Sequence, residues 1–405
     1  MDLELRTVRD DELIDFLLAT STGFGMASPN EDDEYAVHLL PAERCLAVHD
    51  DGAVVATAGA FPFRITVPGG ARVAVAGVTV VTVHPTHRRR GLLRRMMDEQ
   101  LDDVARRGET LAALTASEAS IYERFGYGTA TFATRWELAS EYASARVSAP
   151  ADGSVRLVEG DAAMEAARAV YDVAAAARVG EIERPPNWWT PIFTRGKRGK
   201  GFFTAVHAGR DGRPDAFARY ALDQQWPDGV PCHALRVIEM QAIDADAEAA
   251  LWNYLFGIDL VGTIQAADRP VDDPLRWRLA DARRLRVREL RDHLWVRVVD
   301  VAGALAARTY GTEDALVIEL TDDFRPANSG RWLIEGGPSG AACARTDREP
   351  DLALGAPELG AIYLGGVPVS TLAAAGRIRE LTSGAVTRAD RFFVTHPSPW
   401  CTTHF

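Results

Sequence analysis

The stretch 78–93, VTVVTVHPTHRRRGLL, joins an apolar β-branched run to a basic loop and then to a new pattern. Three arginines lead to Gly91, after which Leu92, Met96 and Leu101 recur at helical spacing. This order predicts a central strand at 78–83 and a helix at 92–107. The free N–H groups and the dipole at a helix start attract anions, and a glycine lets the backbone approach them closely. The stretch therefore predicts a binding site for a pyrophosphate group.

Two other phosphate-binding loops do not fit this stretch. A dinucleotide-binding loop needs G-x-G-x-x-G after its strand, and a nucleoside-triphosphate loop needs G-x-x-x-x-G-K-[ST]; neither pattern is present. A second interpretation of the same residues, a solvated basic turn before a surface helix, stays open because short motifs also occur by chance.

The composition excludes several classes of function. The chain has 405 residues and a net charge of −12, which argues against nucleic acid as a partner and favours a cationic substrate. Its four cysteines lie far apart without a C-x-x-C pair, so neither a metal site nor a disulfide framework is expected. No signal peptide and no apolar run that could span a membrane is visible, so we expect a cytoplasmic protein.

The order of predicted elements divides the chain into three parts. The first is a mixed unit with strands predicted at 3–8, 44–49, 53–63, 66–75, 78–83, 111–115 and 127–138, and a short helix at 119–125. The second, after a linker at 147–153, repeats the order strand, helix, strands, helix, strand without a basic glycine loop. The third predicts strands covered by helices on one face. Chain ends usually fray, yet Trp400 and Phe405 are unusual residues to leave in water.

The basic loop resembles the acetyl-coenzyme A loop of the GNAT acetyltransferase superfamily, whose pattern is Q/R-x-x-G-x-G/A. This chain has R-R-R-G-L-L at 88–93, so a leucine replaces the final small residue. Together with ASEASIYERFGYG at 116–128, a second similar unit and a C-terminal phenylalanine, the whole chain resembles the Eis (enhanced intracellular survival) family of N-acetyltransferases. The resemblance implies an α/β (α+β) fold: two tandem GNAT-like mixed-sheet domains, 1–147 and 154–287, then a sterol carrier protein-like domain, 288–405.

The same resemblance implies a set of site residues for acetyl-CoA and for the chemistry. The cofactor-binding residues would be Val81, Thr82, Val83, Arg88, Arg89, Arg90, Gly91, Leu92, Leu93, Arg94, Ser117 and Glu118. Tyr122 would be the general acid, with Tyr127 as the alternative phenol, and the carboxylate of Phe405 would be the general base. These types suit an amine that loses a proton while a thiolate gains one.

Substrate-contacting candidates are Phe24, Met26, Tyr35, Trp189 and His404. Trp188 and Trp189 follow two prolines, so we expect them at an exposed loop edge, as either an interface plug or a pocket wall. The acidic run 31–34 is either a solvated helix start or an attractor for a cationic substrate. His84 and His87 are expected to help the phosphate site or to lie at its rim.

Three functions remain open at this stage. The first is an acetyl-CoA-dependent N-acetyltransferase that acts on primary amines of a polycationic, aminoglycoside-like small molecule. The second is a protein lysine acetyltransferase, and the third is a non-catalytic lipid- or CoA-binding protein. The family resemblance also implies a homo-hexamer. From composition we expect no metal, no nucleic acid partner and no membrane span.

Overall fold

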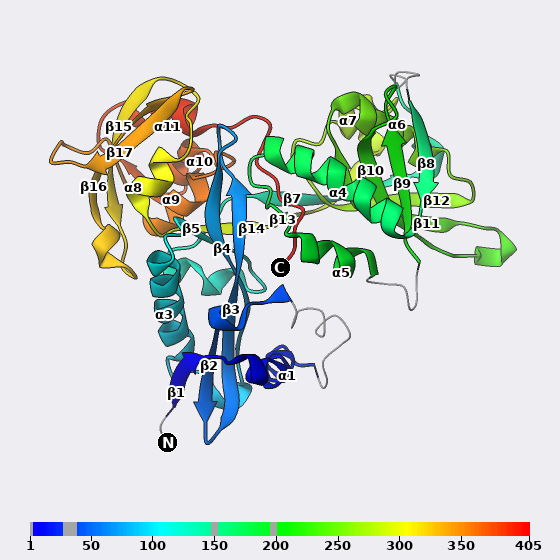
Figure 1. The fold of residues 1–405 in the computed structure, drawn as a ribbon. Helices are drawn as coiled ribbons and strands as arrows, with labels where there is room; N and C mark the ends of the chain where they lie inside the picture. The colour runs from blue at the N-terminus through cyan, green and yellow to red at the C-terminus, as the bar shows by residue number, and fades with distance from the viewer. Residues whose placement is uncertain (1–2, 27–38, 147–152, 195–200) are drawn as a thin grey trace. The chain divides into compact units, whose positions relative to one another are not determined.

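The computed structural model describes residues 3–26, 39–146, 153–194 and 201–405 (Figure 1). It contains two compact units, and each is described by itself below. Unit 1 combines Met1–Thr131 with His293–Phe405, and unit 2 is Phe132–Asp292. Within the described residues, no helix is both long enough and apolar enough to cross a membrane.

The main sheet of unit 1 contains seven strands in its described part, in the order β1-β2-β3-β4-β5-β14-β6. Their bounds are Glu4–Thr7 (β1), Cys45–Asp50 (β2), Ala53–Thr66 (β3), Arg72–Val83 (β4), Leu111–Thr115 (β5), Leu294–Val298 (β14) and Gly128–Thr129 (β6). The strands predicted at 66–75 and 78–83 are one strand, β4. Its start is set by a turn that the Val67 N–H closes on the Ala71 carbonyl, at 2.9 Å.

Strands β4 and β5 run parallel but stay paired over only three residues. Val75, Ala76 and Gly77 pair with Leu111, Ala112 and Ala113, and the described register stops there. Farther along β4, Val80 adopts a φ of 49°, and the pairing with β3 shifts register between Thr57 and Gly59. Such a bulge bends one strand away from its neighbour. The backbone of 78–83 therefore faces an opening instead of β5.

Helix α3 (Leu92–Arg106) confirms the helix predicted at 92–107 and covers this sheet. Met96, Met97, Leu101 and Val104 are completely buried and share a hydrophobic core with strand residues of β3, β4 and β5. Helix α1 (Leu13–Gly23) lies beside β3 and β4 and buries Phe16. These helices hold the strand–loop–helix unit in place through apolar packing.

Two strands join other sheets than the expected domain boundaries at 147 and 288 imply. Strand β14 inserts between β5 and β6 and pairs antiparallel with both. Strand β7 (Phe132–Ala139) instead pairs with β12 and β13 in unit 2. Periodicity identifies a strand but says nothing of its partner, since any buried apolar strand can fill a sheet position.

The C-terminal part of unit 1 is a five-stranded sheet with helices, gathered together in yellow to red in Figure 1. The sheet order is β17-β16-β15-β18-β19, with bounds Gly340–Arg345 (β17), Gly330–Gly337 (β16), Asp314–Thr321 (β15), Leu352–Gly355 (β18) and Ile378–Glu380 (β19). Its helices are α8 (Val301–Ala306), α9 (Ala356–Ile362), α10 (Val369–Ala374) and α11 (Ala385–Phe393). Helix α9 also packs on β14 and β6.

The tail after α11 forms neither helix nor strand, yet it does not fray. Trp400 is 7% exposed, Cys401 is completely buried and Thr403 is 2% exposed. The tail is therefore part of the folded core of unit 1, and its last residue is placed by packing.

Unit 2 repeats the sheet-and-helix plan, with sheet order β13-β7-β12-β11-β10-β9-β8. Its further strands are β8 (Ser154–Val158), β9 (Phe203–Ala208), β10 (Pro214–Asp223), β11 (His233–Ala242), β12 (Val261–Arg269) and β13 (Arg286–Asp292). Its helices are α4 (Gly160–Ala177), α5 (Trp189–Thr194), α6 (Ala245–Phe256) and α7 (Leu275–Arg278). These elements confirm the predicted strand–helix–strands–helix–strand order.

A buried ion pair ties the two sheets of unit 1 together. Arg297 on β14 donates to Asp322, which follows β15, at 2.6 Å, and both side chains are 1% exposed. Asp322 also accepts hydrogen bonds from Asn328 Nδ2 and from the Arg325 N–H. Burial lowers the pKa of Arg297 and Asp322 opposes that effect, so the charge depends on its partner.

We predict that Arg297→Met destabilises the protein by about 3–5 kcal/mol, because it leaves the Asp322 carboxylate buried without a countercharge. The measurement is urea unfolding followed by fluorescence. As a control, Arg106→Met removes an exposed partner of Glu99 and should leave the unfolding midpoint near that of the wild type. Equal midpoints for both variants would contradict the proposed role of the buried pair.

Candidate functional site

A cavity of about 780 Å³ lies in unit 1 where β4 and β5 separate. Its volume lies in the upper part of the range that is typical of ligand-binding pockets. The lining residues are Gly23, Phe24, Val78, Thr79, Val80, Val81, Thr82, Val83, His87, Arg88, Arg89, Gly91, Leu92, Leu93, Arg94, Thr115, Ser117, Glu118, Ile121, Tyr122, Arg124, Phe125 and Phe405. The cavity thus brings together most of the residues that the sequence nominated from three distant segments.

One wall of the cavity is basic. The loop between β4 and α3 turns through positive φ angles at Arg89 (65°) and at Gly91 (77°), which is also the N-cap of α3. Arg88 Nε donates to the Val83 carbonyl at 3.3 Å, and the Arg94 guanidinium lies 5.0 Å from the centre of the Phe324 ring. The loop therefore presents several cations and the start of a 15-residue helix to the same space.

A second wall is the diverging end of β4. The Thr57 hydroxyl donates to the Val80 carbonyl at 2.8 Å and lies 2.8 Å from the Thr82 hydroxyl. Thr20 of α1 donates to Thr57 at 3.2 Å. This chain of hydroxyl groups holds the bulged strand on its β3 side. The β5 side of residues 78–83 stays open to a ligand that could pair with the backbone, as an added strand does.

The two histidines near the loop are held by the protein itself. His87 Nε2 lies 2.9 Å from Asp50 Oδ2 and its Nδ1 lies 2.8 Å from the Thr86 hydroxyl. His84 Nε2 lies 3.3 Å from the Ala19 carbonyl. His87 therefore lines the rim of the cavity with both ring nitrogens engaged.

Tyr122 lies in the cavity wall opposite the loop, between two short 3₁₀ turns, Ala119–Ile121 and Glu123–Phe125. These turns replace the short helix that the sequence predicted. Burial raises the pKa of Tyr122 to about 12, and the nearby Glu118 carboxylate adds to the effect. The phenol consequently keeps its proton at neutral pH and can donate it.

Tyr127 is the alternative phenol, and the structure buries it completely in the hydrophobic core. Its ring packs edge-on against Tyr122 with centroids 5.9 Å apart. Burial also raises the pKa of Tyr127. Among the described residues, only Tyr122 of this pair lines the cavity, so Tyr127 has no access to a ligand there.

The end of the chain reaches the same cavity. Phe405 lines it, and the Phe405 ring packs edge-on against Phe63 of β3 with centroids 5.3 Å apart. Phe405 and Tyr122 therefore line one cavity although 282 residues separate them (123–404). A carboxylate and a protonated phenol are a base and an acid that a proton-coupled transfer can use.

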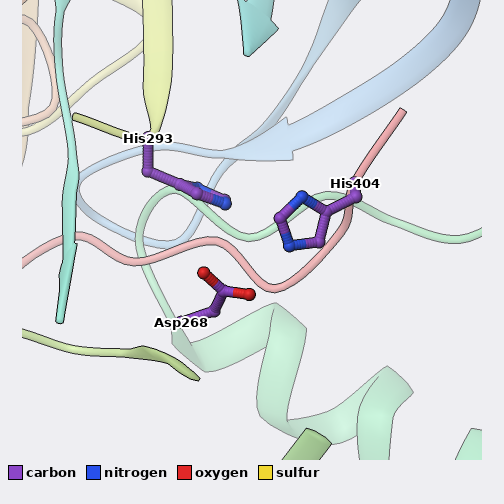
Figure 2. A group of neighbouring side chains, drawn as sticks. All are labelled: Asp268, His293 and His404. Carbon is purple, nitrogen blue, oxygen red and sulfur yellow. The ribbon is translucent and has the colours of Figure 1, made fainter. Parts of the chain in front are cut away.

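Some predicted site residues lie elsewhere. Arg90, Met26 and His404 lie outside the set of described residues that line the cavity. His404 is exposed, and its ring lies edge-on to the ring of buried His293, with centroids 4.9 Å apart (Figure 2). Tyr35 and the acidic run 31–34 lie outside the described residues.

The expectation of exposed indoles at Trp188 and Trp189 is wrong. Both are buried, Trp189 at 1% exposure, and its ring packs against Tyr171 in the core of unit 2. The Arg184 guanidinium lies over the rings of Tyr171 and Trp189. The two prolines before the aromatic pair indicated a change of chain direction. The chain turns toward the core there, because large aromatic rings gain much free energy from burial.

Sequence reasoning missed several residues that shape the site. Thr57 holds the bulged strand and Asp50 holds His87. Phe63 packs against the ring of Phe405. Ile121 and Phe125 complete the apolar part of the lining. The spacing around Tyr122 could have indicated the last two, since they lie on its own turn. No local pattern indicates the first three.

Comparisons with known families agree with this architecture. Residues 4–130 match an acetyltransferase (GNAT) domain family and residues 180–298 match a second one. Residues 301–402 match the sterol carrier protein domain family. The predicted order of two GNAT domains and a sterol carrier protein-like domain is confirmed.

Several relatives match over nearly the whole chain. An uncharacterized N-acetyltransferase of Streptomyces coelicolor is 42% identical over 99% of both chains. N-acetyltransferase Eis of Mycobacterium tuberculosis is 35% identical, over 91% of this chain and 96% of that protein. Eis1 from Mycobacterium abscessus has a solved structure with a TM-score of 0.88 at 32% identity, covering all of both chains. A GCN5-related N-acetyltransferase from Anabaena variabilis, 19% identical with a TM-score of 0.86, shares the fold.

We predict that Tyr122 does not ionise below about pH 11, because burial disfavours the phenolate and holds the pKa at about 12. The measurement is a tyrosinate absorbance titration of the wild type and of Tyr122→Phe. Their difference should stay flat up to about pH 11. A difference signal with an ordinary midpoint near pH 10 would show a solvated phenol and contradict the prediction.

Proposed function

The chain belongs to the Eis family of N-acetyltransferases, and from that premise we propose that it acetylates primary amines of a polycationic, aminoglycoside-like small molecule. In the proposed mechanism the amine attacks acetyl-CoA directly, Tyr122 is the general acid and the Phe405 carboxylate is the general base. The observation that carries the proposal is the single cavity that contains the basic loop, Tyr122 and Phe405.

The residues of the cavity fit a coenzyme A molecule. Acetyltransferases with GNAT domains use acetyl-CoA, which supplies an activated thioester. A space of about 780 Å³ accommodates a long ligand, and three lining arginines, Arg88, Arg89 and Arg94, offer countercharges for its phosphates. Adding a Cβ to Gly91 would meet no atom within 4 Å, so the loop leaves open space beside this glycine.

We assign the remaining contacts by position. The edge of Val81–Val83 that does not pair with β3 faces the opening, where its backbone would hydrogen-bond the amide groups of the pantetheine arm. Ser117 and Glu118 line the opposite side, after the end of β5. Together these groups would orient the thioester carbon toward the amine, and such positioning contributes several kcal/mol to catalysis, about 7–11 at best.

In this proposal the Phe405 carboxylate and the Tyr122 phenol carry out the two proton transfers. The Phe405 carboxylate would accept the proton that the attacking amine loses, directly or through water. The Tyr122 phenol would donate a proton to the departing sulfur, and its raised pKa keeps that proton available at neutral pH.

A cationic substrate suits the charge of the molecule. The net charge is −12, which attracts cations over long range, and Glu118 contributes a carboxylate inside the cavity. Phe24 is 51% exposed at the cavity wall, where an aromatic face can contact a cation. A multiply protonated amine therefore gains more from this site than a neutral one.

We predict that the wild type releases thiol from acetyl-CoA when an aminoglycoside is added, and that a chain lacking Phe405 does so at least about 100-fold more slowly. Its affinity for CoA should stay unchanged, because the loop is intact. The measurement combines a thiol reporter with CoA titration by calorimetry.

Two controls sharpen this experiment. A chain extended by one glycine after Phe405 keeps a carboxylate but moves it by about 3.5 Å, so it should also lose activity. A lysine peptide in the same amine panel tests protein acetylation. No thiol release with any amine would refute both enzymatic functions, and full activity of the shortened chain would refute the role of Phe405 alone.

We also predict that Arg89→Gln weakens CoA binding about tenfold, since one charge-assisted contact with a phosphate contributes about 1.5 kcal/mol. The loss should shrink at high salt. Arg95→Gln is the matched control: it removes the same charge from an arginine that donates to the Leu3 carbonyl. Equal losses in both variants would point to a general effect of net charge instead of a phosphate contact.

A further inference from the structure

The ring of Phe405 occupies a seat made by two residues of the main sheet. It packs edge-on against Phe63 of β3, with ring planes at 69°. It also lies against Gly77 of β4, where a Cβ would be 3.2 Å from the ring atom Cε2 of Phe405. The terminal residue is therefore held by its side chain as well as by the chain that leads to it.

The seat lies where the sheet begins to open. Gly77 is the last described residue of β4 that pairs with β5, opposite Ala113. The next residue, Val78, is the first of β4 to line the cavity. The ring of Phe405 consequently lies beside the point where β4 and β5 separate.

Space, not backbone conformation, requires glycine at position 77. Gly77 pairs regularly with Phe61 of β3, and its extended backbone has a conformation that alanine adopts without strain. A Cβ there would lie 2.5 Å from Cδ2 of Phe63, far closer than van der Waals contact allows. Phe63 is 2% exposed and packs against the Phe61 ring at 5.3 Å, so it has little room to retreat.

The other end of the tail is fixed as well. Trp400 and Cys401 are buried, and the Thr395 N–H donates to the Gly365 carbonyl at 3.2 Å. Arg308, which is also buried, donates to the Phe393 carbonyl at 2.8 Å. The tail is thus anchored before its final residues, and the seat restricts what freedom remains at the terminus.

We propose that Gly77 and Phe63 are positioning residues that aim the C-terminal carboxylate at the attacking amine. The inference rests on the proposed function, because it assigns to Phe405 the role of base. Neither residue touches a reactant; both act through the ring of Phe405. Misplacing a catalytic group by a small distance slows the reaction strongly without preventing the binding of the reactants.

The test is Gly77→Ala in the full chain. We expect kcat to fall at least tenfold with an aminoglycoside, while KM for acetyl-CoA stays within twofold because the basic loop is unchanged. Gly257→Ala is the matched control, since a Cβ there meets its nearest atom at an ordinary 3.5 Å. A wild-type kcat in folded Gly77→Ala, or a parallel rise of KM that signals general damage, would overturn the proposal.

A second variant covers the case in which Gly77→Ala does not fold. Phe63→Leu removes the edge-on partner of Phe405 without adding an atom to β4, and it should show the same fall in kcat at constant KM for acetyl-CoA. An unchanged kcat would overturn the proposal. Removal of Phe405 serves as the reference: if it abolishes turnover while both seat variants remain active, the seat fails and the proposed function stands. If the wild type itself releases no thiol, the proposed function fails.

Discussion

The separation of β4 from β5 beyond Gly77 is the feature on which the site depends. Parallel strands in a sheet normally pair the backbone N–H and C=O groups on their facing edges. A backbone group that is buried without a hydrogen-bond partner costs free energy. Here a bulge at Val80 turns the strand away, and the hydroxyl groups of Thr57 and Thr82 hold the bent segment from the other side. The open backbone is therefore a built feature, stabilised by interactions on the β3 side of the strand.

The insertion of β14 holds β5, the strand on the other side of that opening, in the sheet. This strand starts the C-terminal segment of the chain, pairs with β5 along its free side and carries Arg297 toward Asp322. Because of this pairing, the sterol carrier protein-like part shares one sheet and one buried ion pair with the first GNAT domain. A tail that begins on that part can then reach β4 with a defined length, which a flexible linker between independent domains would not provide.

The sequence predicted what depends on neighbours along the chain. Strand β5, helix α3 and the basic loop have local signals: an apolar run, a period near 3.6 and a glycine at a left-handed turn. The pairing of β7 and β14, the union of 66–75 and 78–83 into one strand, and the burial of Trp189 depend on partners far away in the sequence. Tyr122 was nominated from a family pattern, whereas Phe63, Gly77 and Thr57 carry no pattern at all, because their roles arise only when three strands and the tail meet.

The acid and the base of the proposed pair are held in place in different ways. Burial holds the proton on Tyr122 by raising its pKa to about 12. Phe405, the proposed base, is a half-buried residue that lines the cavity, and its ring makes the apolar contact with Phe63. An aspartate or glutamate has no comparable apolar group with which to anchor itself. A terminal phenylalanine combines the two. Under the proposed mechanism, one residue more or fewer would move the charge away from the ring that places it.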